Sequence, residues 1–296
     1  AGSYSGDEVI VKFKSGVVQS QSTGSHGRIG ASLIRKIQGL SGAELVRIPA
    51  GMSVKDAVNQ YISDPAVEYA EPNYIRKIQS TIPNDQYFGQ QWGLYNTGTF
   101  AAGTAGADIK ANLVWDITTG SSSIVVAVID TGIDYNHQDL HDNIWRNTGE
   151  TSCVDGVDND GNGFVDDCQG WDFTTCSEFD ATGACVTAKA RDNDPWDDYG
   201  HGTHVSGIIG AKGNNNGIGM AGIMWNVRIM PLKALNSQGG GTTADIIAAI
   251  NYAVANGAKI INMSYGSSTY SQSEYDAINA ANTAGVLAIA AAGNES

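Results

Sequence analysis

The sequence has little positive charge and no long apolar run. It carries 17 Lys and Arg against 31 Asp and Glu, a formal net charge of −14. Such an acidic surface repels a phosphate backbone, so we expect no nucleic-acid partner. No apolar run reaches the length of a membrane-spanning helix, and we expect no membrane partner. Residues 1–6 are small and polar, so we expect that any secretion signal was removed or never included.

Cysteines are few and confined to one acidic, loop-rich stretch. They are Cys153, Cys168, Cys176 and Cys185. Three pairings are possible, and the nearest-neighbour set, Cys153 with Cys168 and Cys176 with Cys185, closes the shortest loops. Zinc is the rival interpretation, but there is no Cys-x-x-Cys pair and no histidine among them. We expect disulfides, and therefore an oxidising, extracellular location.

The charge is unevenly distributed along the chain. Residues 1–80 hold nine Lys and Arg against seven Asp and Glu, a net +2 that leaves −16 for residues 81–296. An acidic surface keeps a secreted protein dispersed and favours calcium.

Residues 1–80 have the pattern of a small unit that mixes helices and strands. Apolar alternation predicts strands at 8–14, 43–48 and 67–74, and apolar spacing predicts helices at 29–38 and 54–62. Asp64-Pro65 supplies a break before the last strand.

From Ser123 onward, buried apolar strands alternate with helices. The strands are expected at 124–129, 227–232, 259–263 and 286–292, and the helices at 204–212, 243–256 and 272–284. This α/β pattern indicates a parallel sheet with helices on both faces. Functional groups of such sheets gather at the carboxyl ends of the strands, where Asp130 and Asn294 are expected to lie.

Two short motifs carry residue types that peptide-bond hydrolysis needs. Ala-Val-Ile-Asp-Thr-Gly-Ile-Asp at 127–134 places Asp130 at a strand end, and His-Gly-Thr-His-Val-Ser-Gly at 201–207 places His201 at a helix start. A serine attacks a peptide bond when a histidine removes its proton and a carboxylate holds that histidine in the correct tautomer. Taken alone, the first motif also fits aspartic proteases or a strand-to-turn junction. The second also fits a metal pair or a helix-start histidine, and we expect His204 to be a packing residue.

The order of these motifs resembles the subtilisin-like serine proteases, or subtilases (peptidase family S8). Asn-Met-Ser-Tyr-Gly at 262–266 and Ala-Ala-Ala-Gly-Asn at 290–294 strengthen the resemblance. It implies a subtilisin-like parallel sheet, catalytic roles for Asp130 and His201, and an oxyanion-hole role for Asn294, which otherwise merely ends a strand with a turn. The resemblance also calls for a Gly-Thr-Ser-Met-Ala segment, and the sequence stops at Ser296 without one. We therefore expect a chain that is truncated before its nucleophile and inactive alone.

Two further segments resemble the substrate-binding edges of this family. Ser264, Tyr265 and Gly266 would form one wall of the pocket, with Tyr265 replacing a frequent leucine. Gly239, Gly240 and Gly241 would pair with an extended peptide as an added strand, although they also fit a plain loop. Glu295, near the presumed pocket, suggests a preference for basic substrate side chains.

One acidic loop has the oxygen spacing of a calcium site. Side-chain oxygens stand at alternate positions from Asp158, and a glycine stands where a tight loop must turn, as in the first half of an EF-hand loop. Gln169 occupies the position where an EF-hand has its bidentate glutamate. Cys153 and Cys168 flank the loop, and the alternative is a solvated acidic loop. The expected ligands are Asp158, Asp160, Asn162, the carbonyl of Phe164, Asp166 and Asp167.

The resemblance implies a second calcium site, with an Asn/Gly-rich turn as the alternative. Hard oxygen ligands suit calcium better than a transition metal. The expected ligands are Asp85, Asp139, Asn214, Asn216 and the carbonyls of Ile218 and Met220.

Residues 1–80 resemble the inhibitory propeptide of the family, most closely at 61–74. The resemblance implies a ferredoxin-like α+β domain that assists folding and then inhibits the enzyme. A processing point is expected between about Lys77 and Ile82, and residues 81–296 would be the N-terminal part of the catalytic domain. An ordinary accessory domain is the rival interpretation.

These observations predict a secreted, calcium-stabilised endopeptidase zymogen that acts on peptides or proteins through an acyl-enzyme. The alternative is a pseudo-protease that has lost its nucleophile and serves as a calcium-binding or inhibitor-like module.

Overall fold

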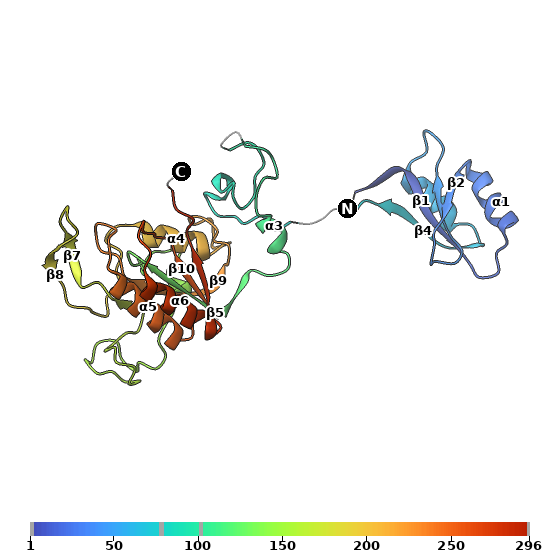
Figure 1. The fold of residues 1–296 in the computed structure, drawn as a ribbon. Helices are drawn as coiled ribbons and strands as arrows, with labels where there is room; N and C mark the ends of the chain where they lie inside the picture. Colours follow the sequence, from blue (N-terminus) through green and yellow to red (C-terminus); the bar gives the residue numbers. More distant parts are fainter. Residues whose placement is uncertain (1–2, 77–79, 101–102, 295–296) are drawn as a thin grey trace. The chain divides into compact units, whose positions relative to one another are not determined.

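The computed structural model describes residues 3–76, 80–100 and 103–294. It divides the chain into two compact units, Ala1–Ile78 and Gln79–Ser296 (Figure 1). The first ends two residues before the expected boundary at 80, which stays a prediction.

The N-terminal unit is a four-stranded antiparallel sheet with two helices. Its strands are ordered β2-β3-β1-β4, and the element order is βαββαβ, the ferredoxin-like arrangement. The elements are β1 (Tyr4–Phe13), α1 (Gln19–Ile29), β2 (Ser32–Lys36), β3 (Ala43–Arg47), α2 (Val54–Ile62) and β4 (Val67–Tyr74).

The helix expected at 29–38 is wrong. Helix α1 already ends at Ile29, where Gly30 adopts a φ of 72°, and the next residues form strand β2. Leu33 and Ile34, which gave the segment its helical spacing, are exposed on this edge strand. Helix α1 itself has almost no apolar residue. It packs through His26, whose ring nitrogens lie 2.8 Å from the Tyr61 hydroxyl and 2.8 Å from the Glu44 carboxylate.

The second unit is built on a five-stranded sheet ordered β11-β10-β5-β9-β6, in which every pairing is parallel. This confirms the predicted α/β class. The strands are β5 (Gly120–Asp130), β6 (Trp171–Asp172), β9 (Asn226–Lys233), β10 (Ile260–Met263) and β11 (Leu287–Ala290). The main helices are α4 (His201–Gly210), α5 (Thr243–Ala255) and α6 (Gln272–Thr283).

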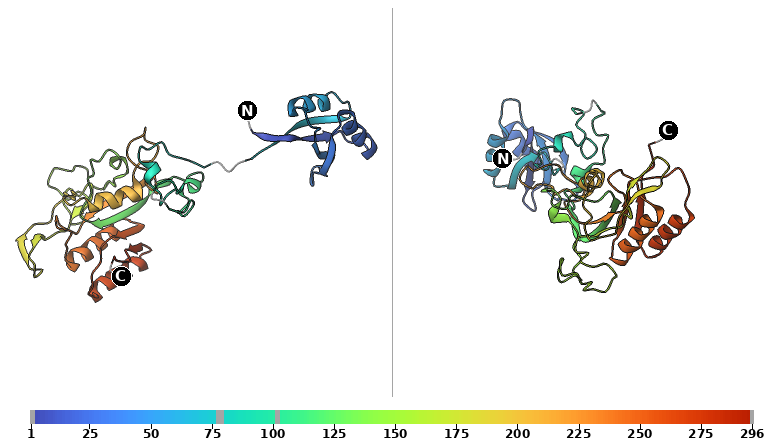
Figure 2. Two further views of the ribbon diagram at one scale, coloured as in Figure 1. Left: turned by 90° about the horizontal axis from the view of Figure 1, so that it is seen from above. Right: turned by 90° about the vertical axis from the view of Figure 1, so that its left-hand side faces the viewer.

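Helices cover both faces of this sheet (Figure 2). Ala127 and Ile129 of β5 pack in a cluster with α5 and α6, whereas Val126 and Val128 pack in another with α4. Successive strand residues point to opposite faces, so this alternation requires apolar cover on each side.

Short elements and two disulfides order the connecting loops. Cys153 pairs with Cys168 and Cys176 with Cys185, which confirms the disulfides and selects the nearest-neighbour pairing. The second bond closes a small antiparallel hairpin. The short elements are η1 (Phe88–Gln90), α3 (Ala111–Val114), η2 (His141–Asn143), β7 (Cys176–Phe179) and β8 (Cys185–Ala188). No helix within the described ranges is both long and apolar enough to cross a membrane.

Candidate active site and acidic loops

Asp130 and His201 meet at the carboxyl edge of the parallel sheet. Asp130 ends β5 and is fully buried, and its Oδ1 lies 2.8 Å from His201 Nδ1. Because a carboxylate accepts, this hydrogen bond places the ring proton on Nδ1 and leaves the Nε2 lone pair available as a base. The His201 side chain is 43% exposed, so the base can be reached from solvent. His204, expected to pack, is exposed.

Asp197 fixes the helix start that carries His201. The N-cap residue of α4 is Gly200, with a φ of 98° and no side chain to cap the helix. Asp197 takes over this role by accepting the backbone N–H groups of Gly200 at 2.8 Å and Thr203 at 2.9 Å. Burial alone raises the pKa of Asp197, but hydrogen bonds from Thr203, Gly200 and Thr131 outweigh it and hold that pKa below its ordinary value.

Thr131 joins the strand end to the same helix start. Its backbone N–H donates to Asp130 Oδ1 at 2.7 Å, and its hydroxyl donates to Asp197 at 2.8 Å. The same hydroxyl accepts the N–H of Gly202 at 2.9 Å. The two residues expected to be catalytic are therefore held by one continuous set of hydrogen bonds.

Two glycines let these segments approach each other closely. A Cβ on Gly202 would lie 2.1 Å from the carbonyl oxygen of Gly132, and a Cβ on Gly132 would lie 2.5 Å from the carbonyl oxygen of Pro195. Gly132 also has a φ of 103°, which side-chain-bearing residues rarely adopt. Any larger residue here would push the helix start away from the strand end.

A buried lysine supports the same edge. Lys233, at the end of β9, pairs in register with Asp130 and is 3% exposed. Its ammonium donates to the Thr131 carbonyl and to Asp198, each at 2.6 Å. Both charges of this pair are met within the protein.

Asn294 lies at the same edge of the sheet by strand register. Met263 of β10 pairs with Ile129 of β5 and with Ala290 of β11, so the three strands end side by side. Asn294 follows β11 by four residues and is exposed. Its role in the oxyanion hole stays a prediction, and Glu295 lies outside the described residues.

The expected substrate walls also follow strands that end at this edge. Ser264 to Gly266 come directly after β10, and the Tyr265 hydroxyl donates to Glu274 at 3.4 Å. Gly239 to Gly241 follow β9, where a Cβ on Gly241 would meet the Ala234 carbonyl at 2.2 Å. Gly241 thus has a packing reason of its own, and its contact with substrate stays a prediction.

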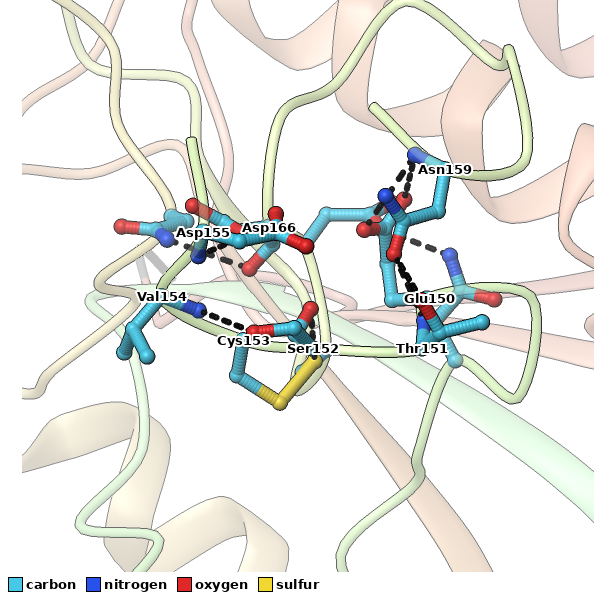
Figure 3. Close-up of a disulfide and its surroundings, with 12 residues drawn as sticks. Glu150, Thr151, Ser152, Cys153, Val154, Asp155, Asn159 and Asp166 are labelled. Atoms are coloured by element: carbon cyan, nitrogen blue, oxygen red, sulfur yellow. Dashed lines mark hydrogen bonds between the residues drawn. A yellow bond between two sulfur atoms is a disulfide. The ribbon is translucent and has the colours of Figure 1, made fainter. Parts of the chain in front are cut away.

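The first acidic loop gathers a carboxylate that sequence spacing missed. Carboxylate oxygens of Glu150, Asp158 and Asp160 lie within 4.8 Å of one another. Figure 3 shows Glu150 accepting the N–H of Asn159, at 3.2 Å, beside the Cys153 disulfide. Burial, together with the charges of Asp167 and Asp160, raises the pKa of Glu150. No signal in the sequence points to Glu150, because it precedes the calcium-like spacing by eight residues.

The other residues expected in this loop are held by contacts within the protein, as the three carboxylates also are. Asn162 donates to Asp160 and Asp167, at 3.2 and 3.0 Å. Asp166 accepts the N–H of Gly156 at 2.9 Å, and the ring of Phe164 packs against Tyr252. Asp158 accepts the N–H groups of Gly161 and Gly163, at 2.7 and 2.8 Å, so the feature of the cluster that fits a hard divalent cation is the proximity of its three carboxylates.

The second expected calcium site brings two buried carboxylates together. Asp85 and Asp139 are 5% and 2% exposed, and burial, with the charge of Asp139, raises the pKa of Asp85. Asp85 Oδ1 and Asn215 Oδ1 are buried without a hydrogen-bond partner in the described part of the chain. Buried oxygens that lack donors suit a cation, so these residues fit calcium.

The loop at 214–220 is shaped to surround these carboxylates. Asn214 and Asn216 adopt positive φ values of 61° and 69°. The Asp85 carboxylate accepts the N–H of Asn214 at 2.8 Å, and Asp139 accepts the N–H of Met220 at 3.0 Å. The expected carbonyl ligand of Ile218 stays a prediction.

Family models match both units. The model described as the subtilase family matches residues 121–296, and the model described as the fervidolysin N-terminal prodomain matches residues 1–73.

Curated relatives are similar over much of the chain. A thermophilic serine proteinase of Bacillus sp. (strain AK1) is 35% identical over 99% of this chain and 60% of its own length. An extracellular protease of Xanthomonas campestris pv. campestris is 33% identical over 90% of this chain and 44% of its own. Subtilisin-like protease 1 of Plasmodium vivax is 37% identical over 71% of this chain and 29% of its own. The chain thus spans 60% or less of the length of these three relatives.

A solved structure of fervidolysin from Fervidobacterium pennivorans, described as a keratinolytic enzyme related to subtilisin, aligns with 99% of this chain and 40% of its own. The TM-score is 0.44 and the sequence identity 22%.

Proposed function

The chain belongs to the subtilase family, and from this premise we propose that the complete protein is a secreted, calcium-stabilised serine endopeptidase made as a zymogen. The observation that carries the proposal is the 2.8 Å hydrogen bond between a fully buried carboxylate and a solvent-accessible imidazole.

The proposed reaction is acyl transfer in two steps. His201 Nε2 takes the proton of a serine hydroxyl while the serine oxygen attacks the peptide carbonyl, and it then gives that proton to the leaving amine. Asp130 holds the ring and stabilises the imidazolium, and Asn294 donates to the oxyanion. Water then hydrolyses the acyl-enzyme by the reverse proton transfers. The serine would come from a Gly-Thr-Ser-Met-Ala segment of the complete protein, which the 296 residues do not contain.

We propose that the N-terminal unit is an intramolecular inhibitor and folding aid. Its match to a prodomain model supports this role. Its net charge of +2 against −16 for the remainder favours association at low salt. The processing point is proposed between about Lys77 and Ile82, of which residues 77–79 lie outside the described ranges.

We propose that calcium is held by Asp85, Asp139 and the 214–220 loop, and by the cluster of Glu150, Asp158 and Asp160. Bound calcium would neutralise carboxylates that the described residues do not pair with Lys or Arg. Two disulfides support export to an oxidising compartment.

A fluorophosphonate, which reacts with activated serines, tests the catalytic proposal. The natively produced, complete protein should gain one label on the predicted serine, and Asp130→Asn should slow labelling strongly. A protein that stays unlabelled after prodomain release, with its calcium in place, would instead favour the pseudo-protease.

A further inference from the structure

A polar pair stands beside the proposed substrate wall. Tyr265 follows β10 by two residues, and β10 ends in register with the residue before Asp130. The Tyr265 hydroxyl donates to Glu274 Oε1 at 3.4 Å, and Glu274 lies in the first turn of α6. This arrangement brings a carboxylate from a separate helix to the edge that carries the catalytic pair.

The hydrogen-bond partner of the Glu274 carboxylate is a neutral hydroxyl rather than a cation. Burial, followed by the charges of Glu274 and Asp130, raises the pKa of Tyr265, so its hydroxyl remains a neutral donor. Glu274 is half-buried, and no Lys or Arg among the residues with described positions forms a salt bridge with it. A neutral hydroxyl orients a carboxylate without cancelling its charge.

A purely structural role explains only part of this geometry. An acidic residue in the first turn of a helix is favourable, and the Glu274 N–H donates to the N-cap Ser271 at 3.3 Å. That role does not require a tyrosine from the substrate wall. Asp276 offers a matched comparison on the same helix, since it is exposed and, within the described part of the chain, its side chain bonds to Gln272 alone, at 2.8 Å.

We propose that Glu274, oriented by Tyr265, selects a basic side chain of an extended peptide substrate. The inference rests on the proposed protease function and names the substrate class for that site. The chain itself supplies a probe: the segment at 71–86, which contains the proposed processing point, carries Arg76 and Lys77 side by side.

The test compares two peptides with the complete protease after its prodomain has been released. One has the sequence of residues 71–86, and the other carries Gln in place of Arg76 and Lys77. We expect kcat/KM to be roughly tenfold higher for the basic peptide, the effect of one partly solvated charge pair in a binding site. Glu274→Gln should remove this preference, Tyr265→Phe should weaken it, and Asp276→Asn should leave it unchanged.

The outcomes separate specificity from stability. An equal loss of activity on both peptides in Glu274→Gln would show a structural role and overturn the inference, as would equal cleavage of both peptides by the parent. If neither peptide is cleaved, the proposed function fails, and Kd values for the same peptides decide the inference: an unchanged preference in Glu274→Gln overturns it.

Discussion

Asp197, at the active-site edge, and Asp85, in the second expected calcium site, have their charges balanced in different ways. Asp197 accepts five hydrogen bonds, and its pKa is lowered despite its burial. Asp85 has one buried oxygen to which none of the residues with described positions donates, and the pKa of Asp85 is raised. Where the chain supplies donors, it sets the geometry by itself. At Asp85 it leaves a buried oxygen without a donor among the described residues, and calcium is proposed to bind there.

Removing the charge of Asp130 should have the largest effect. In the complete protein, Asp130→Asn should lower kcat by about 10⁴-fold, because the amide no longer holds His201 in the tautomer that leaves Nε2 free. Steady-state kinetics on a peptide substrate measures this loss. Asp142→Asn, at a carboxylate that is 61% exposed, serves as the control and should stay near parental activity. A parental rate in Asp130→Asn would contradict the proposal that Asp130 holds His201 in its catalytic tautomer.

Calcium removal tests whether the carboxylates that lack donors depend on a bound cation. A chelator should lower the Tm of the second unit by about 5–10 °C, which corresponds to losing a ligand present at about 100 times its Kd. Differential scanning calorimetry with and without calcium, at constant ionic strength, measures the shift.

Asp85→Asn separates calcium binding from general salt effects. This variant should lose part of the calcium response and gain stability in chelator, because it relieves the repulsion with Asp139. An identical calcium response in the variant and the parent would place the ion elsewhere.

Truncating Asp197 should cost stability in a pH-dependent way. Asp197→Ala should lower the free energy of unfolding by about 2 kcal/mol at neutral pH, through lost capping and unsatisfied donors. The folded pKa lies below the unfolded value, so this contribution is complete above about pH 3.9 and is lost as the pH falls through the folded pKa. Urea titrations at neutral and acidic pH should show the difference from the parent shrinking only in acid.

The smallest effect should come from Asn147, which donates to Asp160 at 2.8 Å and to Asp167 at 2.6 Å. Asn147→Asp replaces this donor by another carboxylate and should destabilise the calcium-free protein by about 1 kcal/mol. Saturating calcium should recover most of the loss in a thermal melt. A penalty that is equal with and without calcium would mean that the ion lies outside this loop.

Sequence reasoning succeeded where a residue is placed by a periodic element. The apolar run at 124–129 predicts Asp130 at a strand end, and β5 does end at Asp130. Strand β11 ends at Ala290, short of the predicted 292, so Asn294 follows it by four residues, and its role stays a prediction. The register of the parallel strands brings the ends of β5 and β11 together. It failed for α1, which packs through Ser22, Ser25 and His26 and so has no apolar period to detect. Glu150 and Asp197 escaped for a related reason, because each acts through backbone amides whose positions only the folded loop defines.

The close approach of Gly132 and Gly202 bears on how this site can change over evolutionary time. Substitution at either glycine would be rejected for reasons of space, whether or not the protein cleaves peptides. In a saturation mutagenesis screen for folding alone, both positions should be as intolerant as any in the unit, while His201, which is solvent-accessible, should accept several replacements. A lineage that abandoned proteolysis would therefore keep the glycines of both motifs and lose the histidine first. The glycines thus indicate common descent, whereas the histidine indicates retained activity.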